Sequence, residues 1–173
     1  MKVVVECFHD AALVYALGIR GEQLRHGGGK GNVLRHLAKL DGNATGIVDA
    51  DPGKQNSNPR EMAKYEARED ACGLKLMEHR GDRRKRLVLI DPTLEEWLLA
   101  RARACEMQLS DYGLPASARE MHKNPRRDRD SGFRRFLVEL AGKDEGMKTF
   151  QRWLGCSECC GSCAECCGLR TEC

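Results

Sequence analysis

Acidic residues stand where strands of this chain are expected to end. Glu6 closes a β-branched run near the start of the chain. Asp49 and Asp51 end another apolar run, in the segment GIVDADPG. Side chains at positions i and i+2 of an extended segment point to the same side. Asp49 and Asp51 are therefore expected to present two carboxylates together.

Carboxylates that crowd together repel one another unless a cation lies among them. Oxygen ligands at a site open to water suit Mg²⁺ or Mn²⁺. Such an ion neutralises charge on a phosphate and activates water for attack. The alternative interpretation is that DADPG only forms an ordinary turn.

A glycine-rich segment, HGGGKGNV at 26–33, is typical of a phosphate-binding turn. It is not a nucleotide-binding P-loop, because Leu24 stands at the first glycine position and Gly31 replaces the hydroxyl residue that would bind Mg²⁺. Lys30, next to a helix that Asn32 is expected to cap, is predicted to meet a phosphate. The alternative is a plain turn with a solvated lysine.

The elements that must position these residues alternate between strand and helix. Apolar periodicity predicts the order β-α-β-α-β for strands at 2–7, 22–26 and 45–49 and helices at 8–18 and 32–40. This order indicates an α/β fold with a mostly parallel, Rossmann-like sheet flanked by helices. Ligands of such sheets gather outside the carboxyl ends of the strands. Glu6, Asp49 and Asp51 are expected to converge there.

The rest of the chain adds helices and strands to this unit. We expect a charged helix at 61–72, strands at 74–77 and 87–90, a helix at 92–105 and closing helices at 133–140 and 147–154. Thr93 and Glu96 form a predicted capping box for the helix at 92–105.

Two basic clusters are expected to flank the acidic site. The first comprises Arg80, Arg83, Arg84, Lys85 and Arg86, and the second comprises Lys123, Arg126, Arg127, Arg129, Arg134 and Arg135. Arginines beside a Mg²⁺ site suit a polyanion such as DNA or RNA. The alternative is two solvated faces, because aspartates dilute both clusters. Aromatic residues make up only 5% of the chain, so base stacking is expected to contribute little.

Three of these features together resemble the TOPRIM domain of topoisomerases, primases and small nucleases. They are Glu at the end of VVVEC, the glycine turn HGGGKGN and the D-x-D of VDADPG. The resemblance covers 1–105, followed by a basic loop and closing helices at 106–154. The segment DPTLEEWLL is similar to a helix of the overcoming-lysogenization-defect nucleases. The resemblance implies a Mg²⁺-dependent nuclease that hydrolyses phosphodiester bonds in DNA or RNA, and it allows an ATPase partner protein.

Carried over by position, the resemblance gives each acidic residue a role. Glu6 resembles the family's general acid or base, and it can also help to hold a second metal ion. Asp49 and Asp51 resemble its metal ligands. Asp10 matches an acidic position after the first Glu, and Glu95 or Glu96 adds a carboxylate in the nuclease branch. The chain departs from the family at position 7, where Cys replaces the usual Gly.

Seven of the ten cysteines lie in the last eighteen residues. Thiolates at chelating intervals are Cys156, Cys159, Cys160, Cys163, Cys166 and Cys167. Zinc in a four-cysteine site and an iron–sulfur cluster are both compatible with this spacing. A thiol-rich tail at 155–173 without a defined role is the third interpretation.

Bulk properties set the remaining expectations. The chain has 173 residues, a net charge of +3, and neither a signal peptide nor an apolar run of membrane-spanning length. A cytoplasmic protein without a membrane partner is expected, and the sequence leaves open a homo-oligomer. The alternative function is a non-catalytic module of TOPRIM shape that binds nucleic acid or a partner and is regulated by metal at the cysteine tail.

Overall fold

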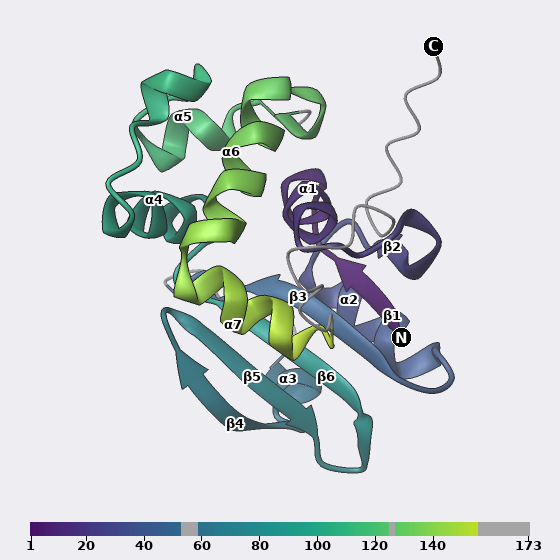
Figure 1. Cartoon of the computed structure of the whole chain (residues 1–173). Coiled ribbons are helices and arrows are strands. Elements are labelled where there is room, and N and C mark those ends of the chain that lie inside the picture. The colour runs from purple at the N-terminus through teal and green to yellow at the C-terminus, as the bar shows by residue number, and fades with distance from the viewer. Residues whose placement is uncertain (53–58, 125–126, 156–173) are drawn as a thin grey trace.

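A single sheet of six strands forms the centre of the computed structural model, which describes residues 1–52, 59–124 and 127–155 (Figure 1). The strand order is β2-β1-β3-β6-β5-β4. The first four strands in this order run parallel, and β5 and β4 run antiparallel to their neighbours. The strands are β1 (Lys2–Val5), β2 (Leu24–His26), β3 (Ala44–Asp49), β4 (Tyr65–Ala71), β5 (Leu74–His79) and β6 (Asp82–Ile90). The expected mostly parallel α/β sheet is confirmed.

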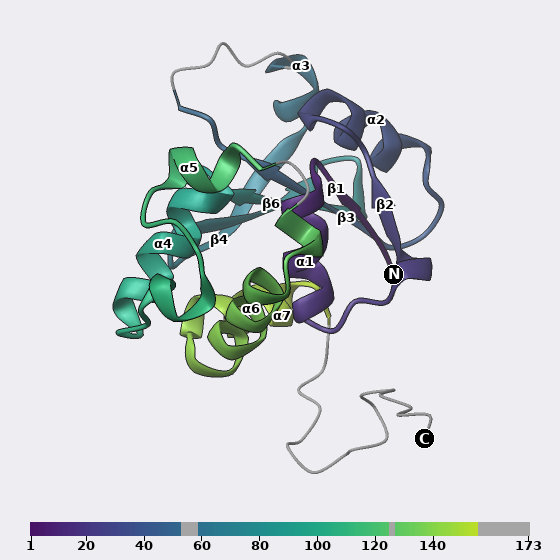
Figure 2. The ribbon, with the colours of Figure 1, turned by 90° about the horizontal axis from the view of Figure 1, so that it is seen from above.

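Helices cover both faces of the sheet, as the view from above shows (Figure 2). The helices α2 and α3 lie on one face, and α1, α4, α6 and α7 lie on the other. The α-helices are α1 (Phe8–Ala16), α2 (Lys30–Lys39), α3 (Pro59–Met62), α4 (Leu94–Ala104), α5 (Ala118–His122), α6 (Ser131–Lys143) and α7 (Glu145–Trp153). Short 3₁₀ helices are η1 (Gly21–Gln23), η2 (Leu109–Tyr112) and η3 (Arg127–Arg129).

Alternation along β1 explains why its three successive valines are all apolar and buried. Val3 and Val5 pack with the core under α1, α4, α6 and α7, whereas Val4 packs with the core under α2. All three valines are fully buried. A parallel strand covered on both faces needs such a continuous apolar run.

The expected helix at 61–72 is wrong. Only α3 is helical there, and β4 follows it as an edge strand paired with β5. The segment YEAREDA contains good helix formers and buries only Tyr65 well. Pairing with β5 overrides that local preference.

The parallel register brings several strand ends to one edge. Val5 pairs with Ile47, and Asp49 pairs with Ile90. The carboxyl ends of β1, β3 and β6 therefore lie side by side. Both α1 and α4 begin at this edge, immediately after β1 and β6.

Two predictions concern residues outside the described ranges. They are the metal site at Cys156, Cys159, Cys160, Cys163, Cys166 and Cys167, and the nucleic-acid contact at Arg126. Among the helices that the structure describes, none is long and apolar enough to cross a membrane.

Candidate active site at the carboxyl ends of the strands

A pocket of about 620 Å³ opens at the carboxyl ends of β1 and β3, and we call it the acidic pocket because six carboxylates of the described residues line it. Its carboxylates belong to Glu6, Asp10, Asp49, Asp51, Glu95 and Glu96, and its other lining includes Gly28, Gly29, Arg119 and His122. The structure thus brings together every acidic residue that the sequence singled out.

Hydrogen bonds tie the three strand ends to one another. Glu6 Oε2 accepts a hydrogen bond of 2.8 Å from the backbone N–H of Asp49. Asp49 Oδ1 in turn accepts one of 2.9 Å from the backbone N–H of Leu94, the first residue of α4. The side chain that ends β1 is therefore fixed against β3, and the side chain that ends β3 is fixed against the helix after β6.

Burial and mutual repulsion raise the pKa of several carboxyl groups in the acidic pocket. Burial, followed by the charges of Asp10 and Glu6, raises the pKa of Asp49 to about 8. Burial is also the main reason that the pKa of Asp10 rises to about 7. The pKa of Glu6 is raised by burial too, although the Asp49 amide and Lys30 oppose the rise. Such carboxylates are electrostatically suited to a bound cation.

Asp10 has a structural contact of its own. Its Oδ2 accepts a 2.8 Å hydrogen bond from the backbone N–H of Cys7, which precedes α1. Cys7 has φ −136° and ψ 179°, an extended backbone that any residue adopts. Cysteine in place of glycine therefore costs no backbone strain next to Glu6.

The glycine turn lies at the same edge. The N–H groups of Gly27 and Gly28 donate to the carbonyls of Val5 and Glu6 at 2.8 and 3.1 Å. A Cβ on Gly27 would lie 3.2 Å from the Val5 carbonyl oxygen, so the tight approach favours glycine. Gly29 caps α2 with φ 131°. The helix therefore begins at Lys30, two residues before the position predicted from Asn32.

Lys30 reaches toward the D-x-D turn. Its Nζ donates to the carbonyl of Ala50, the residue between Asp49 and Asp51, at 3.3 Å. Asp51 itself adopts φ 51°, and its N–H donates to Pro92. The lysine is thus a cation at the edge of the acidic pocket.

Glu95 forms a contact that the sequence analysis missed. Glu95 Oε1 lies 2.8 Å from Nδ1 of buried His9 and 3.1 Å from Nδ1 of exposed His122. His9 Nε2 also lies 2.8 Å from the carbonyl oxygen of Asn124. Burial alone would raise the pKa of Glu95, but the hydrogen bonds with the two imidazoles together have a larger effect, so the pKa is lowered overall. Burial alone would lower the pKa of His9, but the contacts with Glu95 and the Asn124 carbonyl together more than offset it, so the pKa is raised overall.

Glu96 differs from Glu95 in both position and role. It is exposed, and its backbone N–H and carboxylate both contact the Thr93 hydroxyl, at 3.4 and 3.1 Å. Thr93 is confirmed as the N-cap of α4, and the Glu96 carboxylate accepts a hydrogen bond from the Thr93 hydroxyl, whereas in a capping box it would accept from the Thr93 backbone N–H. Local sequence could signal Glu96, whereas the contact of Glu95 with His9 spans 86 positions and leaves no local pattern.

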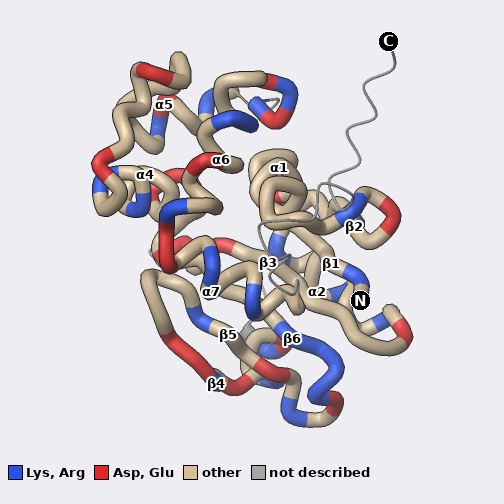
Figure 3. Tube along the Cα trace, in the orientation of Figure 1, with Lys and Arg blue, Asp and Glu red and all other residues tan. Residues whose placement is uncertain are grey.

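The first basic cluster does not flank the acidic pocket, contrary to expectation. Lys85 pairs with Ala44 at the start of β3, whereas Asp49 ends that strand. Five residue steps separate Ala44 from Asp49, a distance of about 16 Å along β3. Figure 3 shows basic residues along the start of β6. Sequence proximity could not reveal at which end of the sheet the β5–β6 turn lies.

Individual members of both basic clusters are engaged elsewhere. Lys85 is buried, and its Nζ donates to the carbonyls of Leu40 and Gly42. Arg84 pairs with Asp82 at 2.9 Å, whereas Arg80 and Arg83 are exposed. Arg127 is also buried, and its Nε donates to the Met121 carbonyl at 3.1 Å. Lys85 and Arg127 are structural residues rather than surface contacts for a nucleic acid.

Comparison of the chain with protein-family models, with curated proteins and with solved structures finds no match. The contacts and charges of the acidic pocket are therefore what point to a function.

Proposed function

We propose that the acidic pocket is the active site of a divalent-cation-dependent nuclease that hydrolyses phosphodiester bonds in DNA or RNA. The supporting observation is the hydrogen bond that fixes Glu6 against the backbone of Asp49. It places carboxylates from two different strands in one pocket that also contains Asp10 and Asp51. The TOPRIM resemblance predicts the same pair of strand ends.

The donor set fits Mg²⁺ or Mn²⁺ by its chemistry. Within the described residues, no three His, Cys, Asp or Glu side chains form a ready-made metal cluster. Mg²⁺ does not require one, because it keeps several waters and binds through one or two carboxylates together with substrate phosphates. Asp49 and Asp51 would hold the ion, with Glu6 beside them. A bound ion would withdraw charge from the phosphate and lower the pKa of a coordinated water.

The chain's own residues supply the other roles. Glu6, whose pKa is raised by burial, accepts the proton of the attacking water. Lys30 and the positive end of the α2 dipole attract a phosphate oxygen, because the helix N-terminus carries partial positive charge. Arg119 lines the same pocket and can contact a neighbouring phosphate.

A cleavage assay tests the proposal. Labelled single- and double-stranded DNA and RNA are incubated with the protein in Mg²⁺, in Mn²⁺ and in chelator. We expect cleavage with either metal ion, none in chelator, and a loss of about a hundredfold or more in Asp49→Asn and Glu6→Gln. Asp41→Asn is the matched control, since this aspartate is exposed and lies outside the acidic pocket.

Two outcomes would contradict the proposal. Cleavage that persists in Asp49→Asn would place catalysis outside the acidic pocket. Binding without cleavage in every metal would favour the non-catalytic module instead.

A further inference from the structure

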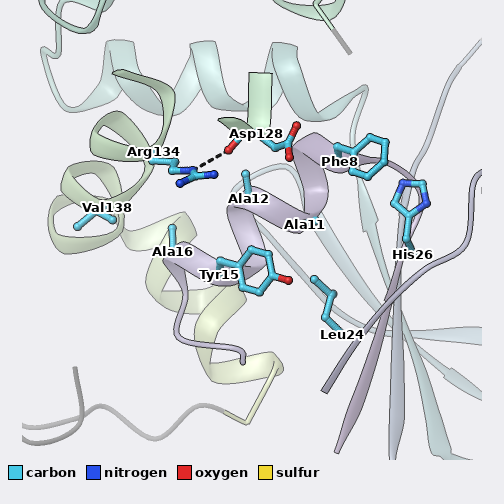
Figure 4. Close-up of a pocket in the computed structure, with 10 residues that line it drawn as sticks. All are labelled: Phe8, Ala11, Ala12, Tyr15, Ala16, Leu24, His26, Asp128, Arg134 and Val138. Atoms are coloured by element: carbon cyan, nitrogen blue, oxygen red, sulfur yellow. Dashed lines mark hydrogen bonds between the residues drawn. The ribbon is translucent and has the colours of Figure 1, made fainter. Parts of the chain in front are cut away.

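A second pocket, of about 660 Å³, lies along α1 beside β2 and α6 (Figure 4). We call it the α1 pocket, and the residues that define it for our purpose are Phe8, Tyr15, Leu24, His26, Arg134 and Val138. Of the four large apolar side chains that the described residues expose, three line this pocket. They are Phe8, Tyr15 and Val138, with exposed fractions of 36%, 52% and 62%.

The α1 pocket gathers ring systems in a chain that has few of them. The rings of Phe8 and His26 stack with their centroids 4.4 Å apart and their planes 18° apart. Tyr15 lies seven residues further along α1, a rise of about 10 Å. Alanines of α1 line the space between them. Exposed rings with small residues between them are the surface on which unpaired bases stack.

The α1 pocket adjoins the acidic pocket. Phe8 follows Glu6 by two residues, and His26 precedes by two residues the Gly28 that lines the acidic pocket. A nucleic-acid strand with one phosphate at the carboxylates therefore has a neighbouring base within reach of the Phe8–His26 pair.

One arginine of the α1 pocket can contact a strand's backbone. Arg134 Nε donates to the backbone carbonyl of Asp128 at 2.7 Å, so its positive charge is oriented at the pocket (Figure 4). The carboxylate of Asp128 also lines the pocket. Within the described residues, the lining therefore carries one arginine and one aspartate, and Arg134 is its one contact suited to a phosphate.

We infer that the α1 pocket binds unpaired bases of a single-stranded nucleic acid, next to the phosphodiester bond that the acidic pocket acts on. This inference rests on the proposed function and narrows its substrate class. A blunt duplex keeps its bases stacked inside the helix and cannot offer them to Phe8 and Tyr15. Single strands, or ends that fray into single strands, are therefore the substrates that fit.

Equilibrium binding in chelator tests the inference, because hydrolysis cannot then interfere. Fluorescence anisotropy is measured with labelled oligothymidylate, with an abasic phosphodiester strand of equal length and with a blunt duplex. We expect oligothymidylate to bind more tightly than the other two. Tyr15→Ala should weaken its binding by about fivefold or more and leave the abasic strand unchanged. Tyr15→Phe, which keeps the ring, should bind as the wild type does.

Three results would overturn the inference. The first is equal affinity for the base-bearing and abasic strands. The second is unchanged binding of oligothymidylate by Tyr15→Ala, after urea unfolding has shown that the variant is as stable as the wild type. The third is a dimer in sedimentation that Tyr15→Ala dissociates without any change in oligonucleotide affinity, which would make the pocket an interface between two copies of the chain.

The two proposals fail separately. If binding depends on the Tyr15 ring but no metal ion supports cleavage, only the nuclease proposal is refuted. If cleavage depends on a metal ion but binding does not depend on the Tyr15 ring, only the assignment of the α1 pocket is refuted.

Discussion

Replacing Asp49 by Asn is expected to stabilise the metal-free protein while it abolishes hydrolysis. Burial and the carboxylates of Asp10 and Glu6 raise the pKa of Asp49 to about 8, well above the ordinary 3.8 of an aspartate. A carboxyl group whose pKa is higher in the folded than in the unfolded chain costs stability. That cost is absent at a pH below the pKa of the carboxyl group in the unfolded chain. It grows as the pH rises toward the pKa of the same group in the folded chain.

The size of the gain follows from this pKa difference. At about pH 7 the pH lies roughly three units above the unfolded pKa, and each unit is worth about 1.4 kcal/mol. The upper limit is therefore about 4 kcal/mol, and we expect a gain of about 2 to 4 kcal/mol in the free energy of unfolding. Asn keeps an oxygen that can accept the 2.9 Å hydrogen bond from the Leu94 N–H, so the start of α4 is not disturbed.

Urea unfolding in chelator, repeated across a pH series, measures the effect. The difference between Asp49→Asn and wild type should be largest near pH 8 and should vanish toward about pH 4. Asp41→Asn, at an exposed aspartate outside the acidic pocket, is the matched control and should show no such trend. An Asp49→Asn variant no more stable than wild type at about pH 7 would refute the electrostatic reasoning.

Three further predictions concern single side chains. Lys30→Ala should lower the cleavage rate by about a hundredfold in a gel assay, because it removes the cation that attracts the phosphate. The urea midpoint should stay unchanged, because the variant loses only one long hydrogen bond. Arg127→Ala should lower the free energy of unfolding by about 2 to 3 kcal/mol, because a buried guanidinium is lost, whereas Arg84→Ala should change it by less than about 0.5 kcal/mol. Asp144→Ala should cost about 3 kcal/mol in urea unfolding, since this buried carboxylate caps α7 and pairs with Arg101 at 2.9 Å.

The sequence was sufficient where one local pattern specifies one structure. The valines of β1 and the apolar run of β3 predicted two buried parallel strands, and their ends predicted where Glu6 and Asp49 would meet. The glycine turn was also placed correctly, because the tight approach of Gly27 to β1 favours a residue without a side chain.

The sequence was not sufficient where distant contacts decide the structure. β4 is made of residues that favour helices, and only its pairing with β5 makes it a strand. The position of the basic β5–β6 turn depends on the pairing of β6 with β3, which no local pattern encodes. The contact of Glu95 with His9 and His122 likewise joins segments that are far apart in the chain.

Binding of Mn²⁺ in solution tests the central claim most directly. The unbound ion gives a strong electron paramagnetic resonance signal, and the decrease of that signal reports binding. Mn²⁺ prefers oxygen ligands, so the cysteine tail should not compete with the acidic pocket. We predict that the wild type binds Mn²⁺ and that Asp49→Asn and Glu6→Gln each weaken the binding by at least about tenfold. Binding of equal strength in all three proteins, or no binding by the wild type, would contradict a cation site between the ends of β1 and β3.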